Sequence, residues 1–217
     1  MIKAENLSKG YNNLPVLREL NFHAQRGEFV IITGKSGCGK STLLNVMSCL
    51  DSFEGGKLSL LGEDVGEMRP RRLYAVRRQE IGFIFQGYNL ISGMNALENV
   101  CLPLKYSHTG YFLRKKAAQD ALIQVDLKDK MYNLPHQLSG GQQQRVAVAR
   151  ALVTNPKILF CDEPTGNLDA ATAQMVLKSI IDLQKNGTTV VMITHDNSLI
   201  HLADTAYNLQ EGKLHKL

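Results

Sequence analysis

Residues 34–42 read Gly34-Lys35-Ser36-Gly37-Cys38-Gly39-Lys40-Ser41-Thr42, and this stretch decides the fold. It fits the pattern G-x-x-x-x-G-K-[ST] of a phosphate-binding loop. The β-branched run Val30-Ile31-Ile32 precedes it, and a helical run from Ser41 to Leu50 follows it. The order strand, loop, helix points backbone N–H groups and the positive end of a helix dipole at one place. The natural guest of such a place is a polyphosphate.

Two side chains of this loop have specific roles in that interpretation. Lys40 is expected as a point charge on the β and γ phosphates, and the Ser41 hydroxyl as a ligand of Mg²⁺. A glycine turn with an ordinary exposed lysine is the alternative, which the pattern by itself leaves open. Because Cys38 lies inside the loop, we expect bound nucleotide to protect its thiol from alkylation.

The composition is that of a globular protein. The chain has 217 residues, 44% of them hydrophobic, which is enough for one or two domains with a full core. No apolar run approaches the roughly 18 residues needed to cross a bilayer, and the first residues show no signal-peptide pattern, so we expect a cytoplasmic location. The four cysteines lack C-x-x-C spacing and are expected as reduced thiols. The net charge of +5 fits nucleic acid, an anionic membrane face or nucleotide, and does not distinguish them.

An antiparallel β layer is predicted ahead of the loop. Residues 2–7 and 20–24 alternate apolar and polar side chains with the period of half-buried strands. Tyr11 lies between these runs, next to Gly10 and Asn12, and is expected on a loop. Its ring is placed either to stack on a purine base or to cover a strand edge.

Three features follow between the first helix and residue 86. An apolar strand over 58–61 is expected to join the β layer. The arginine-rich segment 69–78 favours a solvated helix face over a nucleic-acid patch, because Tyr74 is its one aromatic residue. A strand over 81–85 then ends at Gln86, whose amide is able to reach a metal ion or a water molecule.

The pattern changes to helices after residue 86, with helical periodicity over 96–104, 114–125 and 142–152. We therefore predict one domain in which a helical subdomain, 87–155, is inserted between core segments 1–86 and 156–217. The subdomain contains Leu138-Ser139-Gly140-Gly141-Gln142, where Ser139 caps a helix start that is able to bind an anion. A glycine-rich helix entry without a ligand is the alternative for Ser139-Gly140-Gly141.

Two buried strands complete the core. The strand over 157–161 ends at Asp162 and Glu163, and the strand over 188–193 leads to His195. Carboxyl ends of parallel strands are where α/β sheets place their ligands. Asp162 is interpreted as holding hydrated Mg²⁺ and Glu163 as orienting or deprotonating a water molecule, with a simple helix cap as the alternative. His195 emerges at the same edge, although a lone histidine is more often structural. A hairpin over 209–214 closes the chain.

These motifs occur together, and in this order, in one family. The chain resembles the nucleotide-binding subunit of ATP-binding-cassette (ABC) transporters over essentially its whole length, and the string from Leu138 to Gln142 is nearly diagnostic. The resemblance implies an α/β fold with a P-loop, RecA-like core, an N-terminal antiparallel β layer and an inserted α-helical subdomain. It also implies an ATPase that uses ATP and Mg²⁺.

The resemblance assigns roles to the matching residues. ATP contacts are expected from Tyr11, Gly34, Lys35, Ser36, Gly37, Cys38, Gly39, Lys40, Ser41 and Thr42, and from Ser139, Gly140, Gly141 and Gln142. Metal contacts are expected from Ser41, Gln86 and Asp162. Catalytic roles fall to Glu163 as base and to His195, Lys40 and Gln86.

The resemblance further implies a head-to-tail homodimer. The Ser139 helix start has donors for a phosphate but no full site around it, so the phosphate loop of a second copy would complete it. Two ATP molecules would lie between the subunits, with Asp169 at the dimer seam.

Within the family, the chain looks like the macrolide-exporter (MacB), lipoprotein-release (LolD) and antimicrobial-peptide-exporter branch. The segments that carry this likeness are Phe83 to Gln86, Asn89 to Ile91, Ala96 to Val100, Leu102 to Leu104 and Pro164 to Asp169. They imply export or membrane extraction of a peptide, lipoprotein or drug, powered from the inner face of the cell membrane. A separate FtsX/MacB-like permease would dock on the helical subdomain at 88–104, and no nucleic acid is expected. The alternative is an FtsE-like ATPase that relays a signal through a permease-like partner without transport.

Overall fold

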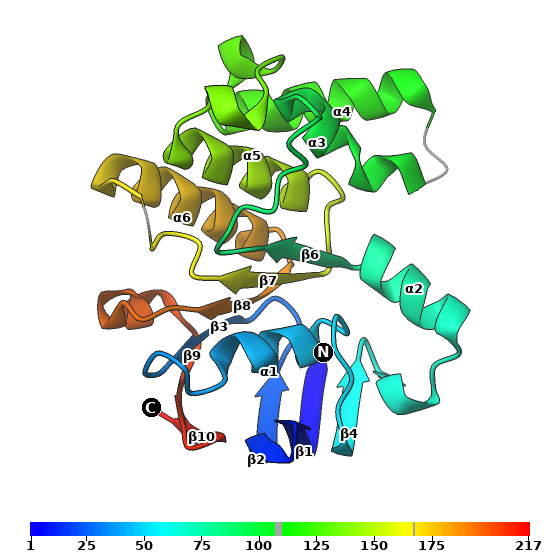
Figure 1. Cartoon of the computed structure of the whole chain (residues 1–217), viewed down its shortest axis with the longest axis vertical. Helices are drawn as coiled ribbons and strands as arrows, with labels where there is room; N and C mark the ends of the chain where they lie inside the picture. The colour runs from blue at the N-terminus through cyan, green and yellow to red at the C-terminus, as the bar shows by residue number, and fades with distance from the viewer. Residues whose placement is uncertain (107–109, 167) are drawn as a thin grey trace.

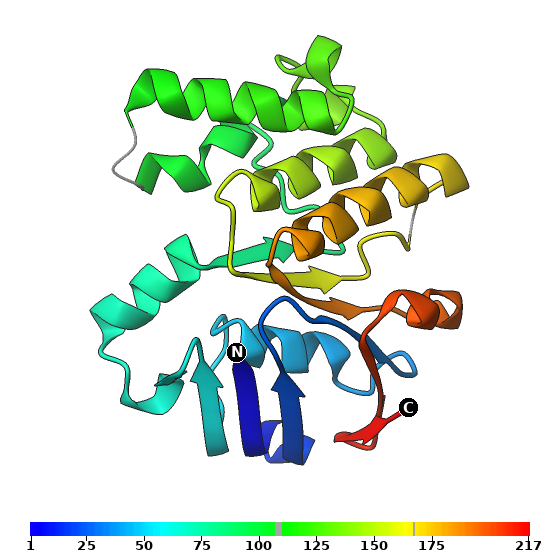
Figure 2. The same ribbon diagram turned by 180° about the vertical axis from the view of Figure 1, so that it is seen from behind.

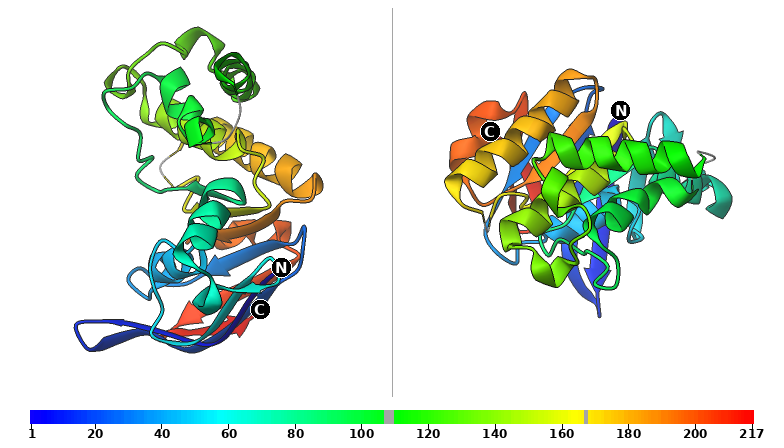
Figure 3. Two further views of the ribbon diagram at one scale, coloured as in Figure 1. Left: turned by 90° about the vertical axis from the view of Figure 1, so that its right-hand side faces the viewer. Right: turned by 90° about the horizontal axis from the view of Figure 1, so that it is seen from above.

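The structure, a computed structural model, describes residues 1–106, 110–166 and 168–217. It has three tiers along its longest axis: an antiparallel sheet, a larger mainly parallel sheet, and a lobe of helices (Figures 1 and 3). The predicted fold class, a P-loop core with an antiparallel β layer and an inserted helical part, is confirmed. Residues 107–109 of the predicted helical subdomain and Asn167 of the segment Pro164 to Asp169 lie outside the described residues.

The antiparallel sheet has the strand order β2-β1-β4-β5. Its strands are β1 (Ile2–Tyr11), β2 (Leu14–Ala24), β4 (Gly55–Leu60) and β5 (Glu63–Asp64). The period-2 pattern places Ile2, Ala4 and Leu7 in the core. Tyr11 is not on a loop, as the glycine and asparagines beside it suggested: it ends β1, opposite Leu14.

The larger sheet has the order β10-β9-β3-β8-β7-β6. It consists of β3 (Phe29–Thr33), β6 (Ile81–Ile84), β7 (Ile158–Asp162), β8 (Thr189–Ile193), β9 (Thr205–Gln210) and β10 (Lys213–Lys216). Strands β6, β7, β8, β3 and β9 pair in parallel, and β9 and β10 form the closing hairpin. The carboxyl ends of β3, β6, β7 and β8 therefore meet at one edge, as their continuous apolar sequences predict.

Helices cover both faces of this sheet. Helix α1 (Lys40–Met47) lies between the two sheets, where Leu43, Leu44, Val46 and Met47 share one core with both (Figure 1). It ends earlier than the expected Leu50, because Cys49 takes a left-handed conformation, φ 60°. The opposite face packs against α6 (Ala170–Lys185) through Val176 and Ile180 (Figure 2).

The arginine-rich segment forms α2 (Pro70–Gln79), whose one buried residue is Val76. The predicted solvated helix is thus confirmed. The lobe contains α3 (Ala96–Cys101), α4 (Tyr111–Gln124) and α5 (Gly140–Leu152). Short 3₁₀ turns link the elements: η1 (Val65–Glu67), η2 (Pro103–Tyr106), η3 (Lys128–Lys130), η4 (Pro135–Gln137) and η5 (Asn197–Leu202).

Candidate functional site

The loop between β3 and α1 is held in a shape that requires glycine at its two ends. Gly34 has φ 154°, and a Cβ there would lie 2.6 Å from the Leu209 carbonyl oxygen. Gly39 has φ 101°, and its Cβ would lie 2.8 Å from the Val16 side chain. Larger residues at these positions would clash and strain the backbone, so the glycines set the curvature of the loop.

Lys40 folds back across the mouth of this loop. Its Nζ donates to the carbonyl oxygens of Gly34 and Lys35, at 2.9 and 3.0 Å, and the residue is only 8% exposed. Both of these partners are neutral carbonyls, so the ammonium charge is available to an anion in the cavity beside it. A phosphate would satisfy this charge better than the carbonyls do.

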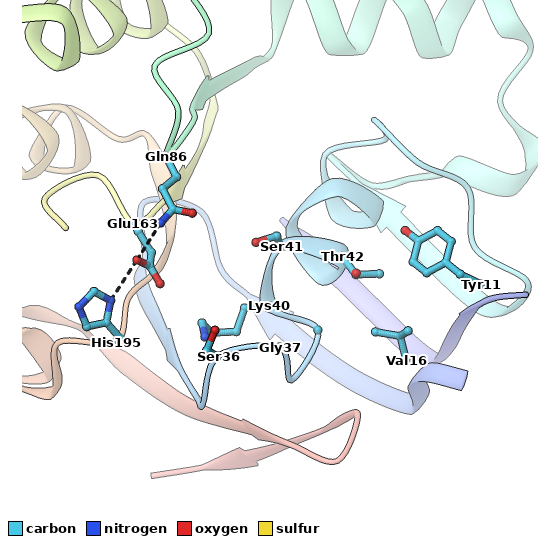
Figure 4. A pocket seen from close by; sticks show the side chains of 11 residues that line it. Tyr11, Val16, Ser36, Gly37, Lys40, Ser41, Thr42, Gln86, Glu163 and His195 are labelled. Carbon is cyan, nitrogen blue, oxygen red and sulfur yellow. Dashed lines mark hydrogen bonds and ion pairs between the residues drawn. The ribbon is translucent and has the colours of Figure 1, made fainter. Parts of the chain in front are cut away.

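A cavity of about 480 Å³ opens in front of the loop. Tyr11 and Val16 lie at one end of it, and Gln86, Glu163 and His195 at the other, with the loop between them (Figure 4). The remaining lining residues belong to the loop and the start of α1: Ser36, Gly37, Gly39, Lys40, Ser41 and Thr42. Gly34, Lys35 and Cys38 line a neighbouring hollow that also reaches His195.

Glu163 is the meeting point of three strand ends. Its Oε2 lies 3.0 Å from His195 Nδ1 and accepts a hydrogen bond from Gln86 Nε2 at 3.3 Å (Figure 4). The backbone of Glu163 is left-handed, φ 46°, an uncommon conformation for a non-glycine residue. These contacts hold the carboxylate at the edge of the cavity, facing the phosphate loop.

Asp162 ends β7 directly before Glu163 and lies beside Ser41. Burial raises the pKa of the Asp162 carboxyl, and the negative charge of Glu163 acts in the same direction. A hydrogen bond with Ser41 and the charge of Lys40 act in the opposite direction. A half-buried carboxylate beside a hydroxyl and an ammonium is suited to hold a cation together with phosphate oxygens.

This donor set fits Mg²⁺ bound together with phosphate oxygens. Within the described ranges, no three His, Cys, Asp or Glu side chains form a group able to hold a metal ion alone. Mg²⁺ is usually bound by one or two protein groups plus phosphates and water. The Ser41 hydroxyl, the Gln86 amide oxygen and the Asp162 carboxylate provide oxygen ligands of that kind.

Tyr11 is positioned by a network that sequence reasoning missed. Its hydroxyl donates to Asp51 Oδ2 at 2.5 Å, and Lys9 Nζ donates to Asp51 Oδ1 at 3.0 Å. The Lys9 ammonium also lies 5.0 Å from the centre of the Tyr11 ring. Asp51 follows α1 by several residues in no recognisable motif, and Val16 is one apolar residue among many in β2, so neither carried a sequence signal.

The Ser139 helix start lies elsewhere on the same chain. Ser139 Oγ accepts from the Gln142 backbone N–H at 3.3 Å, and Gln142 Oε1 accepts from the Ser139 N–H at 3.0 Å, which forms a capping box. A Cβ on Gly140 would lie 3.1 Å from the Tyr88 hydroxyl, and one on Gly141 would lie 3.3 Å from Thr172. These four residues do not line the cavity at Lys40.

Asp169 caps α6 in the same neighbourhood. Its carboxylate accepts from the Thr172 N–H at 3.0 Å and from the Thr172 hydroxyl at 2.7 Å. These two bonds lower the pKa of the Asp169 carboxyl. The predicted set thus separates into two groups on one chain, one around Lys40 and one around Ser139.

Fold and site together define a phosphate-loop ATPase of the ATP-binding-cassette class. The model of the family "ABC transporter" matches residues 17–166, and the chain belongs to this family. It is an ATP-binding subunit with ATPase activity, of the MacB-like branch.

Three relatives illustrate the likeness. An uncharacterized ABC transporter ATP-binding protein of Methanocaldococcus jannaschii is 43% identical, over 99% of this chain and 97% of that protein. The macrolide export ATP-binding/permease protein MacB of Neisseria meningitidis is 40% identical over 99% of this chain, which spans 34% of that longer protein. The ATP-binding cassette MJ0796, solved as a dimer in a post-hydrolysis state bound to ADP and Pi, is 37% identical with a TM-score of 0.94, covering 100% of this chain and 98% of that one.

Among the helices that the structure describes, none combines the length and the apolar composition needed to cross a bilayer.

Proposed function

We propose that this chain powers export, or extraction from the membrane, of a peptide, lipoprotein or drug through a separate permease. The relative matched nearly end to end is named an ATP-binding protein, and the longer MacB proteins are named for both ATP binding and a permease. The observation that carries the proposal is the cluster at Glu163, which lies beside a phosphate loop and is built for hydrolysis.

ATP binding is assigned to the phosphate loop and Tyr11. Backbone N–H groups of residues 34–42 and the start of α1 would hold the phosphates, with Lys40 adding a positive charge. The Tyr11 ring, fixed by Asp51, would stack on the adenine at the far end of the cavity. Ser41, Gln86 and Asp162 would hold Mg²⁺, which supplies neutralisation of phosphate charge when bound.

Glu163 would act as general base. Its carboxylate oxygen is within hydrogen-bond reach of Gln86 and His195, which leaves the carboxylate oriented at the cavity rather than free to rotate. In phosphoryl transfer the protein contributes mainly positioning and charge neutralisation. Glu163 would take the proton of the attacking water, and His195 would contact the γ phosphate from the same edge.

A second copy of the chain would complete each site. The Gly140 and Gly141 N–H groups begin α5 and have no partner within the helix, yet Ser139, Gly140 and Gly141 do not line the cavity of their own chain. The solved cassette that is similar over the whole chain is dimeric. In a head-to-tail homodimer, the Ser139 helix start of one copy would face the phosphate loop of the other, with Asp169 at the seam.

The permease is proposed to dock on the helical lobe at residues 88–104, which places the chain at the inner face of the membrane. This segment leaves β6 directly after Gln86 and ends in α3, so it joins the active site to the lobe surface. A movement of Gln86 on hydrolysis would therefore shift the docking surface that follows it in the chain.

Reconstitution with the permease encoded beside this gene tests the proposal. Proteoliposomes that contain both proteins are expected to hydrolyse ATP faster than the subunit alone. They are also expected to release a peptide, lipoprotein or drug on addition of ATP, whereas proteoliposomes with the Glu163→Gln variant should not release it. ATP-dependent activation of a bound partner enzyme without any release of cargo would instead identify an FtsE-like signalling subunit and refute the transport proposal.

A further inference from the structure

We propose that the corner of the helical lobe formed by the end of η2 and the start of α4 binds directly to an anionic phospholipid bilayer. The corner consists of Lys105 and Tyr106 in η2 and of residues 111–116 in α4. It lies at the right-hand end of α4 in Figure 1, at the outer edge of the lobe. The proposal does not depend on the permease or on the ATP site.

Apolar side chains stand out from this corner. Phe112 is 83% exposed, Leu113 65%, Tyr111 63% and Tyr106 55%. Tyr111 and Phe112 touch edge to face, with ring centres 5.7 Å apart. Partly buried aromatics scattered over a surface need no explanation, but consecutive exposed apolar residues at a helix start do.

The corner also carries a cluster of positive charges. Among the residues that the structure describes, Lys105, Arg114, Lys115 and Lys116 form no ion pair with a carboxylate. Glu98 is used to cap α3, where it accepts from the Asn95 N–H at 2.9 Å. The first acid along α4 is Asp120, one turn beyond Lys116.

Three of these cations, Lys105, Arg114 and Lys115, lie near one point, the Cys101 thiol, although they come from two elements. The Cys101 thiol at the end of α3 lies 3.7 Å from the Arg114 carbonyl oxygen, which ties α3 to the start of α4. Burial raises the pKa of Cys101; the charges of Arg114, Lys105 and Lys115 act in the opposite direction, and the charge of Glu98 adds to the rise. The cluster is therefore compact rather than spread along the chain.

This chemistry matches a lipid surface. Aromatic and aliphatic side chains that project from a helix start insert among acyl chains, and lysines and arginines beside them remain at the headgroups. Each cation near an anionic membrane strengthens binding about fivefold. A docked protein helix would require a groove to receive it, whereas here Phe112 and Leu113 project outward and are largely solvent-exposed.

Vesicle sedimentation of the purified chain tests the proposal. The chain is expected to bind vesicles of phosphatidylcholine with phosphatidylglycerol, to bind pure phosphatidylcholine far less, and to be released by salt. Phe112→Ser with Leu113→Ser keeps the net charge and should weaken binding at least about tenfold. Lys115→Gln with Lys116→Gln should weaken it on the order of 20-fold.

The opposite end of α4 provides matched controls. Lys128→Gln with Lys130→Gln removes the same charge from η3, and Tyr132→Ser removes an aromatic residue that is 67% exposed. Both controls should bind vesicles nearly as the parent does, and all variants should keep the ATP turnover of the parent.

Four results would overturn the proposal. The first is that the parent chain stays in solution in the presence of anionic vesicles. If the Lys128/Lys130 control lost as much vesicle binding as the Lys115/Lys116 variant, net charge alone would explain the attraction. If the Phe112/Leu113 variant bound vesicles as the parent does, these side chains would not insert into the bilayer. Binding that appears only when the vesicles contain the permease would assign the corner to a protein partner instead.

Discussion

Replacement of Glu163 by glutamine tests the hydrolytic role of the cluster with the least change in shape. Glutamine keeps one oxygen to accept a hydrogen bond from Gln86 or His195, which lie 3.3 and 3.0 Å from Glu163 Oε2. It loses the negative charge and the ability to take a proton. A positioned general base contributes about 10²- to 10⁴-fold to rate, which corresponds to about 3 to 5 kcal/mol of the barrier.

ATP affinity should change little in the same variant. The contacts proposed for ATP come from the phosphate loop, Lys40 and Tyr11, and the side chains of Lys40 and Tyr11 are held by groups other than Glu163. Phosphate release at saturating Mg-ATP measures the rate, and titration with a fluorescent ATP analogue measures affinity. Glu5→Gln, in an exposed pair with Lys3, is the matched control. Turnover of Glu163→Gln within about threefold of the parent would refute the assignment of Glu163 as base.

Further outcomes are expected at three residues, Lys40, Cys38 and Asp51. Lys40→Ala should raise the Kd for ATP on the order of tenfold to a hundredfold and lower the turnover, because a charged hydrogen-bond donor is lost; an unchanged ATP titration would contradict the phosphate-loop assignment. Maleimide should inhibit hydrolysis by alkylating Cys38, and bound ATP should protect that thiol. In a peptide map, Cys101, which is also partly exposed, should be labelled equally with and without ATP. Labelling of Cys38 that is unchanged by ATP would count against the loop as the nucleotide site. Asp51→Ala should raise the KM for ATP about three- to tenfold at unchanged kcat, since Tyr11 loses its anchor. The hydrogen bond from the Tyr11 hydroxyl also lowers the pKa of Asp51. The stability that this pair contributes is therefore fully present above the unfolded-state pKa of Asp51, near 4, and is lost as the pH falls through the lower pKa of the folded state. An Asp51→Ala variant whose melting temperature falls with acid as steeply as that of the parent would contradict this contribution.

Elements with continuous or alternating apolar patterns could be predicted from the sequence. The buried strand before Asp162 and the one before His195 have no polar interruption, and both lie in the parallel sheet. Their common edge follows from the topology of such sheets, which is why the meeting of Glu163 with His195 could be anticipated.

Contacts between distant segments could not be predicted in this way. Asp51 reaches Tyr11 across 40 positions in the chain, and nothing in the local sequence of either residue signals the pair. Tyr11 was expected on a loop because Gly10 and Asn12 disfavour strands, but pairing with β2 extends β1 through it. The left-handed backbone of Glu163 also depends on the surrounding fold rather than on its residue type.

The composite nature of the site is tested most directly by mixing two inactive variants. Lys40→Ala disables the phosphate loop, and Ser139→Arg blocks the helix start, so each variant alone should hydrolyse almost no ATP. In a mixed dimer, one site combines the intact loop of one chain with the intact Ser139 of the other. Equal mixing should therefore restore about a quarter of the parent rate, because half of the dimers are mixed and each has one of two sites intact. A mixture as inactive as its components, under conditions where exchange of labelled subunits is observed, would show that Lys40 and Ser139 do not act on the same nucleotide across two chains.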